Sequence, residues 1–238
     1  MQSFIIHMSA STERRANAEH LCHTLPEAEL IEAVDGRDPN RIRDVEVFPG
    51  TLYQPRYPFA LRSAEIGVFE SHRKIWRRIV DERLDCAIIT EDDLKIVPDR
   101  FAAVIQLVND YASPDSYIRL PVKQRETPAQ VVTHQDGLQL ILPKRIGLQC
   151  ICQVVGRNAA RRLLTVTDRI DRPVDTLLQM HWITGQPVHA ILGTGNMEVA
   201  AQIGGSTIQR KIRPGKKLGR EIKRAVYRAQ VSLRPQKP

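Results

Sequence analysis

The sequence lacks any hydrophobic run of the roughly 20 residues that a membrane-spanning helix requires. The short apolar run near its start follows no basic residue, so we also expect no secretory signal peptide. Cysteine is scarce, and none of Cys22, Cys86, Cys150 and Cys152 forms the C-x-x-C spacing of a zinc site or a redox motif. These absences predict a cytoplasmic protein with reduced, buried thiols.

Acidic residues are almost absent from residues 210–238. This segment holds eleven Lys and Arg residues and one acid, Glu221, whereas the whole chain has a net charge of +8. Residues 1–209 therefore carry a net charge of −2. A nucleic-acid-binding protein is expected to spread basic residues around its binding site, so this distribution predicts that nucleic acid is not a partner.

Apolar residues recur every three or four positions along the basic segment, while Lys and Arg fill the other side. The recurring residues are Leu218, Ile222, Ala225, Val226, Ala229 and Leu233. This pattern is typical of an amphipathic helix that rests on anionic lipid, and a solvated tail is the alternative. We predict a domain at 1–209 followed by a basic amphipathic tail at 210–238 that contacts the inner face of the cytoplasmic membrane.

Strand and helix patterns alternate along the first half of the chain, and strands dominate the second half. Short apolar runs predict strands at 3–8, 28–36, 86–90, 117–120, 138–142, 147–155 and 188–192. Helical spacing predicts helices at 11–25, from Ser63 onward, at 100–112, at 157–166 and near 174–184. This order predicts a single α/β domain around a mixed, mainly parallel central sheet.

Three consecutive acids, Glu91, Asp92 and Asp93, directly follow the apolar run at 86–90. Neighbouring carboxylates repel one another, so the fold must offset their charge. Open α/β sheets bind their ligands at the C-terminal ends of strands. In an extended segment Glu91 and Asp93 share one side, and two carboxylates suit Mg²⁺ or Mn²⁺. We predict that Glu91 and Asp93 hold a divalent metal, with a solvated acidic turn as the alternative.

Two motifs around these acids resemble glycosyltransferase family 25. The stretch SAEIGVFESHRKIWRRIV at 63–80 precedes CAIITEDDLKI at 86–96, and family members show a Ser-Glu-Ile-Gly run that ends in Ser-His ahead of an acidic strand end. Blocks at 5–15, 33–36, 152–164, 171–175 and 204–210 resemble the other motifs of the family in the same order. His7 and Met8 stand where Asn and Leu are usual.

The resemblance implies a GT-A type, Rossmann-like fold and an inverting transfer from a UDP-sugar, with Mn²⁺ or Mg²⁺ at the diphosphate. It implies galactose as the sugar and a hydroxyl of lipopolysaccharide or another cell-surface glycan or glycolipid as the acceptor. Asp175, in the DRPVD block, is the candidate general base, and a helix-capping role is its alternative. The residues implied in donor binding are Met8, Arg14, Asp35, Gly36, Glu65, Ser71, His72 and Asp92.

Two other interpretations of the sequence stay open. Paired acids and a basic tail also fit a two-metal nuclease or phosphoryl-transfer enzyme, although the acidic body disfavours it. A non-catalytic glycan- or lipid-binding module would carry the same acids as a surface turn. Asp93→Ala separates the transferase from such a module, because the module would keep its ligand affinity and the metal-dependent transferase would not.

Overall fold

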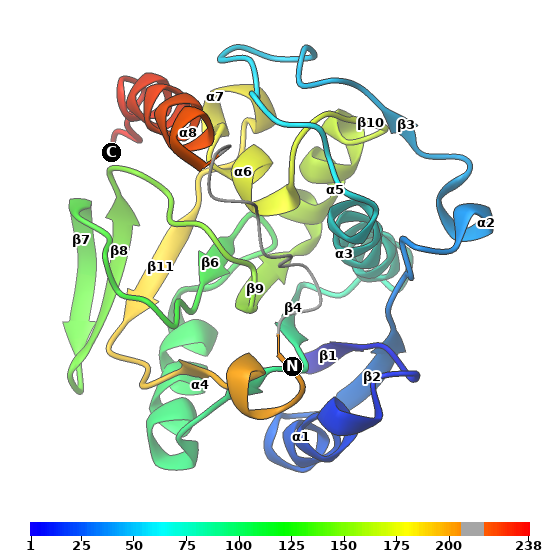
Figure 1. Ribbon diagram of the computed structural model, residues 1–238. Coiled ribbons are helices and arrows are strands. Elements are labelled where there is room, and N and C mark those ends of the chain that lie inside the picture. The colour runs from blue at the N-terminus through cyan, green and yellow to red at the C-terminus, as the bar shows by residue number, and fades with distance from the viewer. Residues whose placement is uncertain (206–216) are drawn as a thin grey trace.

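The computed structural model describes residues 1–205 and 217–238, and an eight-stranded sheet lies at its centre (Figure 1). The strands follow the order β2-β1-β4-β9-β6-β11-β8-β7. They are β1 (Gln2–His7), β2 (Ala28–Glu32), β4 (Cys86–Glu91), β6 (Tyr117–Arg119), β7 (Pro128–Gln135), β8 (Leu138–Pro143), β9 (Cys152–Gly156) and β11 (His189–Leu192). The predicted mixed α/β fold is confirmed.

The sheet is mainly parallel because most of its strands point in one direction. Strands β9 and β8 pair antiparallel with all their neighbours, and the other six strands point the same way. The C-terminal ends of β1, β2 and β4 therefore meet at one edge. That edge is where the acids at 91–93 lie.

The helices cover both faces of the sheet and connect its strands. The longer ones are α1 (Thr12–Thr24), α3 (Ser63–Asp81), α4 (Pro98–Tyr111), α5 (Arg157–Val166) and α8 (Lys217–Ser232). The shorter ones are α2 (Pro39–Ile42), α6 (Val174–Leu178), α7 (His181–Thr184) and the 3₁₀ helix η1 (Ala200–Gln202). Two small ladders pair β3 (Glu46–Val47) with β10 (Arg169–Ile170) and β5 (Leu94–Lys95) with β12 (Met197–Glu198). None of the helices within 1–205 and 217–238 has the length and apolar character of a membrane span.

Two hydrophobic clusters, one on each face of the sheet, form the core. Successive residues of a strand point to opposite faces, so Phe4 joins Trp76 of α3 and Leu163 of α5 in one cluster, whereas Ile5 joins the cluster of α1 and α4. The central strands are apolar on both sides because helices cover both sides, as the continuous runs of the sequence predict.

The structure differs from the predicted elements mainly in the second half. The strand predicted at 147–155 begins at Cys152, and the helix predicted near 174–184 divides into α6 and α7. Strand β7 has no predicted counterpart, because most of its side chains are exposed and give no apolar alternation. The predicted boundary between 209 and 210 lies outside the described residues.

Candidate functional site

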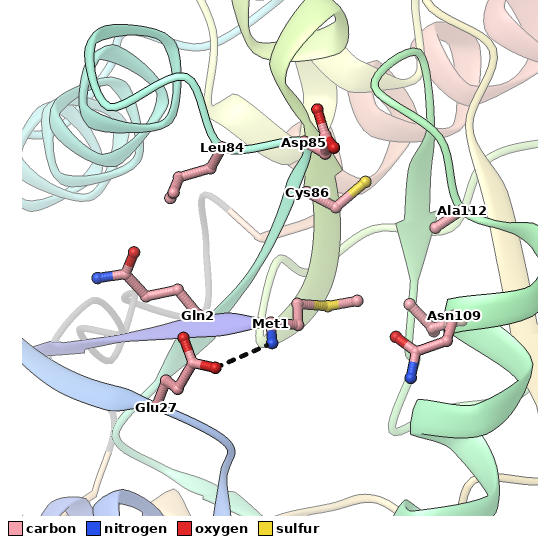
Figure 2. A pocket seen from close by; sticks show the side chains of 9 residues that line it. Met1, Gln2, Glu27, Leu84, Asp85, Cys86, Asn109 and Ala112 are labelled. Atoms are coloured by element: carbon pink, nitrogen blue, oxygen red, sulfur yellow. Dashed lines mark hydrogen bonds and ion pairs between the residues drawn. The ribbon is translucent and has the colours of Figure 1, made fainter.

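Two cavities lie at opposite edges of the sheet. The smaller, of about 350 Å³, lies at the N-terminal ends of β1 and β4 (Figure 2). Its acids are already paired, since Glu27 meets the Met1 ammonium group at 3.4 Å and Asp85 meets Arg157 at 3.5 Å. The larger cavity, of about 600 Å³, lies at the C-terminal ends of the same strands. The larger cavity is the candidate site, because it gathers the three acids at 91–93, and Asp93 there keeps a buried oxygen with no hydrogen-bond partner among the described residues.

All eleven residues that the sequence analysis singled out line this larger cavity. They are Met8, Arg14, Asp35, Gly36, Glu65, Ser71, His72, Glu91, Asp92, Asp93 and Asp175. Helices α1, α3 and α6 and the end of β4 supply six of them, and the segments that follow β1, β2 and β4 supply the other five. Their shared location is a property of the fold, and the role of each residue remains a prediction.

Glu91, Asp92 and Asp93, here called the carboxylate turn, do not form the extended segment that was expected. Glu91 ends β4, while Asp92 and Asp93 form a tight turn into β5. Asp92 is buried between His7 Nδ1 at 2.8 Å and Arg14 Nη1 at 2.6 Å. Both oxygens of Asp92 are thus held by neighbouring side chains. Asp92 therefore positions Arg14 and His7 in this structure.

Asp93 is the carboxylate whose charge the protein offsets only in part. It is 6% exposed, and its Oδ1 has no hydrogen-bond partner among the described residues. Burial raises the pKa of Asp93 to about 7, and the charges of Glu91, Asp92 and Glu198 add to this rise. Arg14, whose Nη1 lies 3.3 Å from Asp93 Oδ2, lowers the pKa but does not outweigh burial.

Glu91 faces the cavity beside a buried histidine. His72 Nε2 lies 3.8 Å from Glu91 Oε1, and His72 Nδ1 lies 3.3 Å from Gln153 Nε2. When the Gln153 amide donates to Nδ1, the ring proton sits on Nε2 and points toward Glu91. At 3.8 Å this contact is too long to be a hydrogen bond, so Glu91 keeps its capacity to accept from a ligand.

The open oxygens of Glu91 and Asp93 fit a hard divalent cation, because Mg²⁺ and Mn²⁺ prefer carboxylate ligands. Within 1–205 and 217–238 there is no ready-made group of three or more His, Cys, Asp or Glu ligands. Two carboxylates nevertheless match the way Mg²⁺ binds, since it commonly takes one or two protein carboxylates and completes its shell with water and substrate phosphate. The residues present therefore fit the predicted metal only as part of a metal–diphosphate complex.

Helix α3 holds the loop after β2 against the cavity through close backbone packing. The Ser71 hydroxyl accepts from Val34 N at 2.8 Å and donates to Gly67 O. A Cβ on Gly36 would lie 1.8 Å from Ser63 O, so a glycine is required there. Ser71 and Gly36 thus shape the cavity wall, whatever contact they make with a ligand.

Two further predicted donor-binding acids are engaged locally. Glu65 accepts from Arg62 N at 2.8 Å, which ties the first turn of α3 to the residue before it. Asp35 binds the side chain of Arg37, and this hydrogen bond lowers the pKa of Asp35. Both carboxylates line the cavity in their ion-paired form.

Asp175 stands in the first turn of α6 but does not cap it. Its Oδ2 accepts from Gln149 N at 3.0 Å, and its Oδ1 accepts from the Thr176 hydroxyl at 3.2 Å. The hydrogen bond from Gln149 N holds the carboxylate against the segment 148–151, which also lines the cavity. The helix-capping alternative is therefore not what the structure shows.

The sequence analysis missed two residues of the site. His7 ends β1 and reaches Asp92, 85 positions later, and Glu198 lines the cavity on β12. The pairing of β12 with β5 and the hydrogen bond from Val199 N to Asp93 O at 2.9 Å bring Glu198 beside the carboxylate turn. An isolated acid in a polar stretch gives no sequence signal, so only the ladder reveals Glu198.

Comparison with known proteins gives one family. The model of glycosyltransferase family 25 (LPS biosynthesis protein) matches residues 1–178. Procollagen galactosyltransferase 2 of Homo sapiens is 28% identical over 184 residues, which are 69% of this chain and 29% of that protein. A glycosyltransferase 25 family member of Drosophila melanogaster is 32% identical over 146 residues, or 57% of this chain and 23% of that protein. A probable inactive glycosyltransferase 25 family member 3 of Bos taurus is 29% identical over 188 residues, which are 74% of this chain and 30% of that protein.

The chain spans less than a third of the length of these three relatives. Among solved structures, mannose-1-phosphate geranyltransferase of Thermus thermophilus is similar with a TM-score of 0.38 and 9% identity, over 81% of this chain and 73% of that one. That likeness is too distant to support a functional conclusion. Since the family model matches more than half of the residues, this chain belongs to glycosyltransferase family 25.

Proposed function

We propose that this chain is a metal-dependent glycosyltransferase of the GT-A type that uses a UDP-sugar donor. The donor sugar is galactose, and the acceptor is a hydroxyl of lipopolysaccharide or another cell-surface glycan. One observation carries the proposal: Asp93 is buried at the end of a central strand with an oxygen that no described group satisfies, beside Glu91. A buried carboxylate that is only partly offset, beside a second and less buried one, is costly for the fold, so it points to a bound cation.

Glu91 and Asp93 are the residues that would hold Mn²⁺ or Mg²⁺. When bound, such an ion neutralises the charge that develops on the diphosphate as the bond to the sugar breaks. The chain's own contribution is to place the two carboxylates in a 600 Å³ cavity at the C-terminal strand edge. The names of relatives as galactosyltransferases support galactose, and the family model's description supports the lipopolysaccharide acceptor.

The charged residues next to Glu91 and Asp93 have different proposed roles. Arg14, held by Asp92, keeps a cation beside the metal carboxylates, where it offsets the charge of a diphosphate. His7 keeps Asp92 in place from the end of β1. These three residues support the donor phosphates, and the proton of the acceptor must pass to a different group.

Asp175 is the candidate base because it faces the cavity from the other wall. In an inverting reaction the acceptor hydroxyl attacks the anomeric carbon as the bond to the diphosphate breaks, and its proton passes to a carboxylate. Asp175 Oδ2 receives its hydrogen bond from Gln149 N, which keeps the carboxylate oriented. Asp175→Asn removes the base, so we expect it to lower kcat while donor affinity stays within about twofold.

Calorimetric titration of UDP-galactose and UDP-glucose, with and without Mn²⁺, tests the proposal. We expect one UDP-sugar to bind, only when Mn²⁺ is present, and Asp93→Asn to abolish that binding. Asp110→Asn, which changes an exposed acid on α4, is the matched control and should bind as the parent does. Absence of nucleotide binding under both conditions would contradict the proposal.

A non-catalytic glycan-binding protein is the second candidate, and the names of relatives favour it. The Bos taurus and Mus musculus proteins similar to this chain are named as inactive members of the family. In that case Asp93→Asn leaves glycan affinity intact and no sugar is transferred. Detection of labelled galactose on an acceptor would exclude the non-catalytic function.

A further inference from the structure

We infer that helix α8 is a docking surface for an anionic membrane, and that it is fixed to the catalytic body rather than tethered to it. The inference stands on α8 alone and does not require the proposed transferase activity. Its basis is an exposed apolar stripe, here called the α8 stripe, made of Leu218, Ile222, Val226 and Leu233. Figure 1 shows α8 on the outside of the molecule beside α7.

The α8 stripe is the most exposed apolar surface of the described residues. Its four side chains are 73%, 57%, 53% and 82% exposed, while every other exposed large hydrophobic side chain in 1–205 and 217–238 is at most 46% exposed. Isolated surface aliphatics are ordinary, but three at four-residue spacing on one side of α8, with Leu233 just beyond its end, are not isolated. Such an exposed apolar patch is expected where the surface binds a partner.

The opposite side of α8 packs against the body. Tyr227 and Val231 are buried, one helical turn apart, and lie about opposite to Ile222 on the helix. The Tyr227 hydroxyl lies 3.1 Å from Arg172 Nη1, and Arg172 is itself fully buried against Asp171. Beyond the helix, Gln236 is buried and bonds to both Val188 N and Val188 O. The helix therefore presents the stripe outward from a rigid base.

The basic residues beside the α8 stripe indicate which kind of partner binds it. Residues 217–238 hold seven Lys and Arg residues against Glu221, a net charge of +6. Lys223 and Arg228 are exposed and lie on the two flanks of the stripe. Basic residues beside an apolar strip match an anionic lipid surface, where each contributes about 1 kcal/mol to binding. A two-fold contact with a second copy would instead bring the same basic flanks together, which is unfavourable.

Attachment of α8 links this surface to the wall of the candidate site. The Tyr227 ring meets the Tyr57 ring edge-on at 5.5 Å, and Tyr57 lines the cavity. Arg220 stacks 4.6 Å from the centre of the Phe59 ring, two residues further along the same loop. A membrane under α8 would therefore hold the cavity at a fixed orientation to the lipid surface.

Vesicle co-sedimentation of the full chain, without donor or metal, tests the inference. The probes are vesicles of phosphatidylcholine alone and of phosphatidylcholine with phosphatidylglycerol. We expect binding only to the anionic vesicles, weakened by salt. The triple variant Leu218→Gln/Ile222→Gln/Val226→Gln should lower the partition coefficient at least about tenfold, because it removes the apolar contact.

Two matched variants separate the contributions of charge and apolar surface. Lys223→Glu/Arg228→Glu keeps the stripe and should also lose anionic binding, whereas Tyr111→Gln/Val131→Gln changes two exposed apolar side chains elsewhere and should not. Equal binding of the triple variant and the parent would overturn the inference. So would sedimentation of the parent as a dimer that the triple variant converts to a monomer, since a second copy would then be the occupant. Donor calorimetry on the triple variant should match the parent, which keeps this test distinct from the proposed function.

Discussion

At the carboxylate turn, a buried oxygen of Asp93 has no partner among the described residues, whereas on α8 and just beyond its end four large aliphatic side chains are exposed. The first arrangement leaves charge only partly compensated inside the protein, and the second leaves apolar surface uncovered outside it. Each is unfavourable for the isolated chain, and each would become favourable with the ligand proposed for it: a cation with a diphosphate, or an anionic lipid surface. Both regions therefore hold an arrangement that is unfavourable without a ligand, one through buried charge and the other through exposed apolar surface, and this is why we propose a binding partner for each.

The largest expected effect is on catalysis at the carboxylate turn. If the proposed function holds, Asp93→Asn should lower kcat/KM for the UDP-sugar at least about 1000-fold, or about 4 kcal/mol, because it would remove a ligand of the proposed metal. Steady-state transfer of labelled sugar measures it. Asp110→Asn should retain activity within about twofold. Transfer by Asp93→Asn at the parent rate would mean that the turn has no part in the reaction.

The second effect concerns the attachment of α8 to the body. Arg172→Met leaves Asp171, 1% exposed, without its counter-ion and should lower the free energy of unfolding by about 3 kcal/mol. Urea denaturation gives the value. Arg157→Met, at a partly exposed pair with Asp85, should cost less than about 1 kcal/mol. Equal losses in the two variants would show that the buried pair does not secure the helix.

The third effect is the pH dependence that the carboxylate turn imposes on stability. Since the pKa of Asp93 is raised to about 7 in the folded protein, the folded state binds the proton more tightly than the unfolded state. Stability should therefore fall as pH rises from about 4 to about 7, through the range between the unfolded and folded pKa values. Metal-free Asp93→Asn should lack this fall and unfold at a higher temperature than the parent at pH 8. A lower melting temperature for Asp93→Asn at pH 8 would show that the carboxylate is already compensated.

The smallest effect is on the stability of the outward side of α8. Leu218→Gln and Ile222→Gln should each change the free energy of unfolding by less than about 0.5 kcal/mol, because neither side chain is packed. Ile89→Gln, at a fully buried position of β4, is the contrast and should unfold the protein or cost several kcal/mol. Thermal denaturation of the three variants checks the difference. A large loss at Leu218 or Ile222 would mean that the stripe is covered within the chain itself.

Much of the fold was predictable because strands and helices carry local patterns. The continuous apolar run at 86–90 predicts a strand covered on both faces, and Ile88 and Ile89 indeed point into the two different clusters. Strand β7 was missed because its exposed side chains carry no apolar periodicity. The apolar spacing of α8 was predictable, but the side on which the helix packs was not, since Tyr227 and Val231 belong to no strong local pattern.

Short-range patterns in the sequence were enough to predict three acids at the C-terminal end of a central strand and a basic helix with an apolar stripe within residues 210–238. Only the tertiary structure decided that Asp92 is held by His7 and Arg14 while Asp93 is left with an open oxygen. It alone placed Glu198 beside the turn and the α8 stripe away from the body. The physical reason is that strand pairing and helix docking bring together residues that lie far apart along the chain, and charge balance depends on those neighbours.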